Sequence, residues 1–164
     1  LITMDLLSQS YILLDVSIAL VLGGILGIER EWKQRPAGLR TNMIIAGSAA
    51  LLVSLVRVVV SDFSSLASAE SYGVDPIRML HAVIVGVSFI GAGTILKSTS
   101  KTMVRYLTTS ATILMAAGVG ISIALKQYVL GAGATFILVI INFLFAKLNR
   151  IIYNISDYES PYEE

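Results

Sequence analysis

The sequence predicts an all-α fold, a polytopic transmembrane helix bundle of about five spans. Hydrophobic residues make up 55% of the 164 residues and charged residues only 14%, whereas a soluble domain has about 25% charged residues. The mean hydropathy is +0.80. Several apolar runs also approach the roughly 20 residues that a helix needs to cross a bilayer. We therefore expect an integral membrane protein that has the lipid bilayer as a partner.

The predicted spans are residues 11–28, 39–60, 77–96, 107–125 and 128–148. The last two are separated only by Lys126 and Gln127, so they must form a tight antiparallel hairpin. Small residues recur at helical spacing on most spans, which lets helix backbones approach closely; on the third span they are Ala82, Gly86 and Gly93. We expect one compact helical domain over residues 1–150. Residues 151–164 are expected to be a cytoplasmic tail or linker.

The orientation follows from the basic residues of the loops. The second loop, residues 61–76, has no lysine or arginine, whereas the first and third loops with their edges hold Arg30, Lys33, Arg35, Arg40, Lys97, Lys101 and Arg105. Basic loops stay in the cytoplasm. Five spans then place the N-terminus outside and the C-terminus in the cytoplasm.

Composition also argues against several functions. The formal net charge of +1 gives no reason to expect a nucleic-acid partner. The absence of cysteine removes disulfides and thiolate metal sites. No nucleophile lies in a recognisable motif with a base, and the single histidine, His81, is expected to be a hydrogen-bonded interior residue. The protein is therefore not expected to be an enzyme.

The end of the first span carries two candidate acids. Glu29 and Lys33 are four residues apart, which predicts a surface ion pair. Glu31 lies four residues after Gly27 and is predicted to continue the glycine face into the bundle. The alternative is a solvated interfacial helix end that Trp32 anchors.

The second span opens after a turn at Pro36 and Gly38. Thr41 or Asn42 is predicted to satisfy free backbone donors at the start of the helix. Arg40 has two interpretations that the sequence leaves open. It either reaches lipid phosphates or holds Glu29 or Glu31 in an ion pair.

The predicted outer end of the bundle carries Asp15, an acid inside the first span and therefore a functional-site candidate. Its expected partners are Arg57, Arg78 and His81, and a purely structural ion pair is the alternative. Asp75 is predicted to cap the third span, with Pro76 in the first turn.

The fourth span opens with Thr108 and Thr109, whose hydroxyls either bond backbone carbonyls or line a polar cytoplasmic mouth beside Gly91 and Gly93. A cation pathway would use these groups together with acids at both ends. Hard cations prefer oxygen ligands that include carboxylates. The candidate ligands of such a cation are Asp15, Asp75, Glu29 and Glu31.

Four stretches together resemble the membrane domain of the MgtC/SapB family, also called the YhiD family, of bacterial inner-membrane proteins. They are Gly27–Glu31, Pro36–Thr41, Asp75 and Arg78 with Phe89–Gly93, and Leu107–Thr109. Three residues depart from the family pattern and predict slightly looser packing between the third and fourth spans: Ser88 and Tyr106 replace glycine, and Ser110 replaces alanine.

The resemblance implies a role linked to magnesium limitation, acid stress or virulence. The first functional hypothesis that it implies is a non-enzymatic membrane regulator. Such a regulator acts through homo-oligomerisation or through a membrane protein partner such as the proton-driven ATP synthase or a transporter. The alternative is a magnesium transporter or channel that uses the four acids and the glycine-rich third span. Many members also carry a cytoplasmic regulatory domain after the fifth span.

Overall fold

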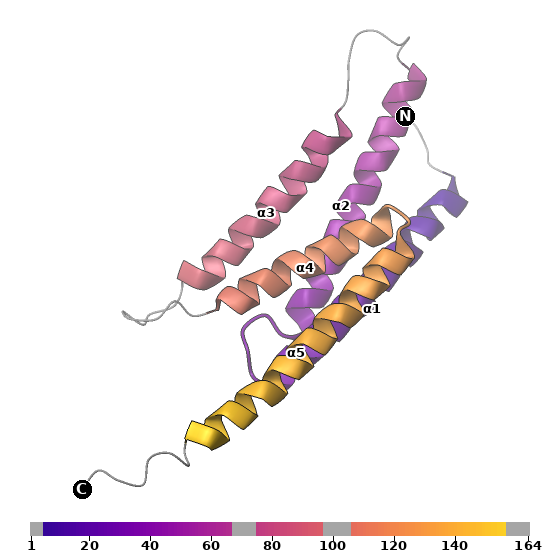
Figure 1. Ribbon diagram of the computed structural model, residues 1–164. Helices are drawn as coiled ribbons and strands as arrows, with labels where there is room; N and C mark the ends of the chain where they lie inside the picture. Colours follow the sequence, from indigo (N-terminus) through magenta and orange to yellow (C-terminus); the bar gives the residue numbers. More distant parts are fainter. Residues whose placement is uncertain (1–4, 67–74, 97–105, 157–164) are drawn as a thin grey trace, which may run out of the picture.

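The computed structural model describes residues 5–66, 75–96 and 106–156. They form five helices (Figure 1), namely α1 (Leu6–Trp32), α2 (Leu39–Leu66), α3 (Pro76–Leu96), α4 (Leu107–Ala124) and α5 (Tyr128–Ser156). The predicted all-α helix bundle is thus confirmed. Within the described ranges, α1, α2, α4 and α5 are long and apolar enough to cross a membrane, whereas the apolar part of α3, Leu80–Leu96, is shorter.

Several helices extend beyond the predicted spans. Helix α1 begins at Leu6 rather than Tyr11, and α2 continues to Leu66. Helix α5 runs to Ser156, so the first six residues of the predicted tail, 151–156, are helical. A long helix can leave the apolar layer and continue in water, which a search for apolar runs does not detect. The rest of the predicted tail lies outside the described residues.

Helix α4 is the centre of the bundle. It contacts each of the other four helices, whereas α3 contacts only α2 and α4, and α5 contacts only α1 and α4. Figure 1 shows α3 along one edge and α5 beside α1. Half of the residues of α4 are accordingly buried.

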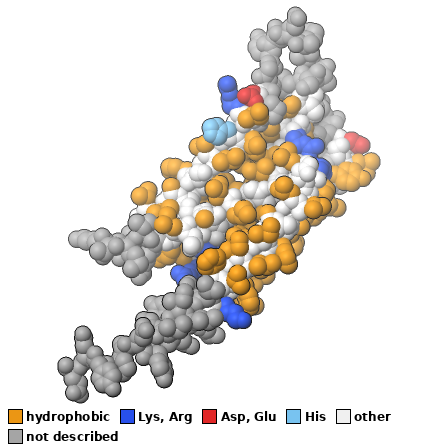
Figure 2. Space-filling view, in the orientation of Figure 1, with side chains coloured by type: hydrophobic (Ala, Val, Ile, Leu, Met, Phe, Trp, Pro, Cys, Tyr) orange, Lys and Arg blue, Asp and Glu red, His pale blue; other side chains and the backbone are white. Residues whose placement is uncertain are grey.

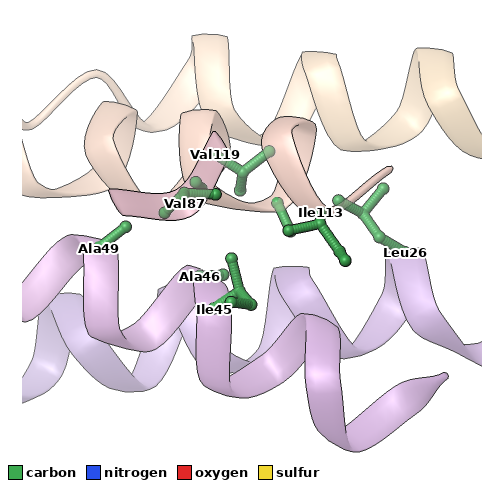
Figure 3. Packing of buried hydrophobic residues seen from close by; sticks show 9 residues of the cluster. Leu26, Ile45, Ala46, Ala49, Val87, Ile113 and Val119 are labelled. Carbon is green, nitrogen blue, oxygen red and sulfur yellow. The ribbon is translucent and has the colours of Figure 1, made fainter. Parts of the chain in front are cut away.

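The core between α1, α2, α3 and α4 consists of small and branched apolar side chains (Figure 3). Its members are Leu26, Ile45, Ala46, Ala49, Val87, Ile113, Ala116, Ala117 and Val119. Alanine at so many core positions keeps the helix axes close, as expected where lipid removes the hydrophobic drive for helix association.

Three glycines mark the closest approaches of helix backbones. A Cβ atom on Gly120 would lie 2.1 Å from the carbonyl oxygen of Ala46, and one on Gly23 would lie 2.5 Å from that of Asn42. A Cβ on Gly27 would lie 2.6 Å from the Cα of Leu39. Any larger residue would force these helices apart, so the predicted small-residue packing is confirmed for α1, α2 and α4.

The same prediction is wrong for part of α3. Gly91 lies against Ser110, but Gly86 and Gly93 have no atom within 4 Å of the position of an added Cβ. Both glycines and Ala82 are exposed. Between α3 and α4 a groove of about 160 Å³ is lined by residues that include Ser88, Gly91 and Ser110, in agreement with the looser packing that the departures from the family pattern predict.

Two short turns set the direction of the hairpins. Just after the end of α1, Gln34 has φ 50°, and the N–H of Arg35 donates to the carbonyl of Arg30. Helix α4 ends in the same way, with Lys126 at φ 63°. This left-handed ending reverses the chain within a few residues, so the predicted tight hairpin at Lys126 and Gln127 is confirmed.

Candidate functional site

A buried arginine links the first and fourth helices. Arg30 is only 6% exposed. Its Nη2 donates to Thr109 Oγ1 at 2.5 Å, and its Nη1 donates to Thr112 Oγ1 at 3.1 Å. Its Nε has no acceptor in the described part of the chain. We call Arg30, Thr109 and Thr112 the Arg30 cluster.

The Arg30 cluster has no carboxylate within ion-pair distance among the described residues. Thr112 also donates to the carbonyl of Thr108, one turn earlier in α4, at 2.7 Å. The two hydroxyls therefore solvate the guanidinium without neutralising it. A charge left unpaired in this way costs folding free energy, so we infer that its position serves more than packing.

Three of the four sequence stretches that resemble the family meet around this cluster. Gly27, one turn before Arg30, lies against Gly38 and Leu39 at the start of α2, while Thr109 lies in the first turn of α4. The ends of three helices are thus fixed to one another by glycine contacts and by the guanidinium. This end of the bundle is the candidate functional site.

Glu31 does not face into the bundle, contrary to the prediction. It is exposed, and its Oε2 accepts the backbone N–H of Leu39 at 2.9 Å, so it caps the first turn of α2. Glu29 forms the predicted ion pair with Lys33. Positions three and four residues after Gly27 share one helix face, and Arg30 rather than Glu31 takes the interior position.

Residues at the start of α2 have different roles from those predicted. Asn42 is fully buried, and its Nδ2 donates to the carbonyls of Ala37 and Gly38 at 2.7 and 2.9 Å. It therefore satisfies acceptors of the turn and not the free donors of the helix. Its Oδ1 has no donor in the described part of the chain. Thr41 is half-buried, and Arg40 is exposed and forms no ion pair with Glu29 or Glu31.

A second polar cluster lies at the opposite end of α1, about 22 Å from Arg30 along the helix. Asp15 is 1% exposed, forms an ion pair with Lys126 and accepts the hydroxyl of Tyr128 at 2.8 Å. The hydrogen bond that Lys126 donates to Asp15 raises the pKa of Lys126 above its ordinary value of 10.5. We call these three residues the Asp15 cluster.

The predicted partners of Asp15 were wrong. Arg57 donates instead to the carbonyl of Ala124 at 2.5 Å, and Arg78 and His81 are exposed. His81 is therefore not an interior residue. Lys126 takes the place of these partners because the α4–α5 turn returns the chain to the end of the bundle where Asp15 lies.

The remaining candidates do not converge on one site. The Oδ1 of Asp75 accepts the N–H of Ile77 at 3.0 Å, which confirms the predicted cap of α3. Gly91 is buried against α4, whereas Gly93 and Thr108 are exposed. Lys97 lies outside the described residues.

The four acids that were predicted as metal ligands lie apart from one another and have different partners. Asp15 and Asp75 have different partners, and Glu29 and Glu31 lie at the opposite end of α1 from Asp15. In the described ranges, no group of three or more histidine, cysteine, aspartate or glutamate side chains is placed to hold a metal ion. A cation would therefore need carboxylates that the fold keeps apart.

Sequence reasoning missed Arg30 and Lys126. A signal existed for each. Gly23, Gly27 and Arg30 follow one helix face at spacings of four and three residues. The predicted topology also placed the Lys126 turn at the same level as Asp15. From the sequence, Arg30 was predicted only to contribute to the charge of the first loop, and Lys126 only to separate the last two spans.

Comparison with known proteins places this arrangement in a family. Residues 16–151 match the MgtC family. The chain is 34% identical to Protein MgtC of Salmonella typhimurium over 132 residues, which are 80% of this chain and 51% of that protein. It is 39% identical to Protein SapB of Bacillus subtilis over 136 residues, 81% of this chain and 56% of that protein.

Protein MgtC of Brucella abortus is 36% identical over 134 residues, 82% of this chain and 51% of that protein. The chain thus spans about half the length of the curated relatives it matches. No solved structure matches significantly. The family match and the level of identity to these relatives agree with the resemblance seen in the sequence, and the chain belongs to the MgtC family.

Proposed function

We propose that this protein is a non-enzymatic regulator in a bacterial inner membrane, linked to magnesium homeostasis or stress adaptation, that acts by contact with a membrane protein partner or with copies of itself. We further propose that its N-terminus lies outside and its C-terminus in the cytoplasm, on the basis of the basic residues in the first and third loops. Family membership supports the membrane and magnesium parts of the proposal. A regulator is favoured over a transporter by the charges inside the bundle.

The observation that carries the proposal is the buried cation at the Arg30 cluster. Arg30 has hydroxyl partners but no carboxylate among the described residues. By Coulomb's law, a divalent cation about 8 Å from an unpaired guanidinium would meet a repulsion of about 4 kcal/mol at an effective dielectric constant of about 20. A magnesium path through this end of the bundle is therefore unfavourable.

The acids give the same indication. A transport site needs carboxylates that are free to exchange water for protein oxygens around the ion. Asp15 is neutralised by Lys126, Glu29 by Lys33, and Glu31 and Asp75 cap helices. These bonds would have to break before any of the four acids bound a metal ion.

The proposal is tested by growth under magnesium limitation. A bacterial strain lacking its own family member is complemented with this chain, and its growth and its rate of magnesium uptake are measured together. We expect wild type to restore growth without raising the uptake rate. Restored growth that rises in proportion to uptake would favour the transporter instead.

Arg30→Met extends the test to the site. Replacing a buried charge with an apolar side chain of similar length is often neutral or stabilising, so this variant is expected to fold and reach the membrane. We expect it to lose complementation. Arg35→Met, which changes an exposed arginine just beyond the end of α1, is the matched control and is expected to complement fully. Full activity of Arg30→Met would exclude the Arg30 cluster from the function.

A further inference from the structure

An apolar cleft opens at the end of the bundle that holds the Asp15 cluster. It has a volume of about 140 Å³ and lies between α2, the start of α3 and the end of α4. Its lining, which we call the Arg57 cleft, is Val53, Val56, Arg57, Ile77, Leu80 and Leu125. Apolar cavities of about this size stay dry and accept a hydrocarbon as large as benzene. The cleft therefore suits a short stretch of hydrocarbon.

The cleft carries one charged group. Nη1 of Arg57 donates to the carbonyl of Ala124, the last residue of α4. This bond fixes the guanidinium at the rim, beside the carbonyl end of a helix. The rest of its N–H groups have no acceptor in the described part of the chain, and no carboxylate there lies within ion-pair distance. Their fork geometry suits two oxygens of one anion.

A second basic residue reinforces the positive charge. Arg78 follows Ile77 of the cleft on α3 and is exposed without an ion-pair partner in the described ranges. Figure 2 shows basic side chains on either side of an apolar patch at this end of the molecule. Lys126 is also near, but Asp15 neutralises it. Asp75, at the start of α3, reduces the local charge without removing it.

We propose that the Arg57 cleft binds an anionic phospholipid of the surrounding bilayer. Part of one acyl chain fills the apolar cleft, and the headgroup phosphate accepts hydrogen bonds from the free N–H groups of Arg57. The cleft lies where the apolar stretch of α4 ends, and we expect headgroups to meet acyl chains at this level. Basic pockets between membrane helices bind anionic headgroups by the same chemistry.

Charge also argues against a second copy of the chain as the occupant. In a symmetric dimer the same patch faces itself. Arg57 would then lie near its own counterpart, and two unpaired guanidinium groups in a membrane repel each other. The phosphate of an anionic lipid provides the missing negative charge. A zwitterionic lipid also has a phosphate, but its headgroup carries a cation that cancels this charge.

The test measures lipid selectivity of the purified full chain. Dioleoylphosphatidylglycerol or dioleoylphosphatidylcholine is titrated into the protein in detergent, and bound lipid is counted by native mass spectrometry. We expect wild type to bind the anionic lipid at least about fivefold more tightly. Arg57→Gln should abolish this preference, and Val56→Trp, which fills the cleft, should weaken binding of both lipids. Arg35→Gln, which changes an exposed arginine at the opposite end, should behave as wild type.

Three results would overturn the proposal. The first is equal binding of the two lipids by wild type, and the second is an unchanged preference in Arg57→Gln. The third is a Val56→Trp variant whose oligomeric state, measured by light scattering, changes while its lipid binding does not, which would assign the cleft to a second copy. If Arg57→Gln does not fold, Arg57→Lys replaces it in the second test. This variant keeps the charge but loses the fork of N–H groups, and it must show a reduced preference for the anionic lipid.

Discussion

The substitution Gly120→Ala tests the packing of α4 against α2 most directly. The added Cβ would lie 2.1 Å from the carbonyl oxygen of Ala46 and 2.9 Å from its carbonyl carbon. These are backbone atoms, so no side chain can rotate away. To reach an ordinary contact of 3.4 Å from 2.1 Å, one helix must move by about 1.3 Å. Because α4 contacts all the other helices, that movement disturbs the whole bundle.

We expect Gly120→Ala to lower the free energy of unfolding by about 1–3 kcal/mol relative to Gly118→Ala. Gly118 lies in the same helix but has no atom within 4 Å of an added Cβ. Both changes alter helix propensity equally, so their difference isolates the clash. The measurement is loss of helical circular dichroism in mixed micelles as a denaturing detergent is added. Equal stabilities of the two variants would refute the close approach of α2 and α4.

Two further predictions concern polar contacts. The raised pKa of Lys126 means that its ion pair with Asp15 stabilises the fold fully from neutral pH up to pH 10.5, and that this stabilisation is lost as pH rises through the folded-state pKa of Lys126. The stability difference between wild type and Lys126→Gln, followed by thermal melting, should thus be constant from pH 7 to about pH 10 and shrink at higher pH; a difference that already falls near neutral pH contradicts this assignment. An added Cβ on Gly38 would meet Oε2 of Glu31, a mobile atom, at 1.8 Å and displace it from the N–H of Leu39. Gly38→Ala and Glu31→Ala should each lower the free energy of unfolding by about 1 kcal/mol in melting experiments. The double variant should lose little more than either single variant. Additive losses would show that the two changes act separately.

The helices were predictable from the sequence because membrane spans are encoded by apolar length. Interactions within one helix or at its end were also predictable. The cap by Asp75 and the Glu29–Lys33 pair each depend on residues only two to four positions apart. Such contacts follow from helix geometry alone and need no knowledge of the neighbouring helices.

Contacts between helices were harder to predict. A glycine in a membrane helix permits close approach but does not show which neighbour approaches, so Gly120 and Gly86 look alike in the sequence although only Gly120 is in close contact. Arg30 and Glu31 both follow Gly27 at positions that share its face. The hydroxyls of Thr109 and Thr112 decide between them, and they belong to a helix far along the chain.

The left-handed turn residues show a similar limit. Tyr106 has φ 74° just before α4, at the position where the family pattern has glycine. A side chain in this region costs roughly 1–2 kcal/mol relative to the right-handed conformation. The replacement of glycine by Tyr106 was visible in the sequence, but the left-handed backbone conformation at this position was not.

We propose that this bundle does not conduct magnesium, because the four candidate acids are engaged separately and the buried charge at the Arg30 cluster is positive. The most direct measurement is magnesium flux into liposomes that contain the purified chain and an internal magnesium indicator. Wild type, Glu29→Ala and Asp75→Ala are compared with protein-free liposomes after correct insertion has been verified by protease protection. We predict no flux above the protein-free level for any of the three. Flux through wild type that either substitution abolishes would contradict the account and make these acids ligands of a cation pathway.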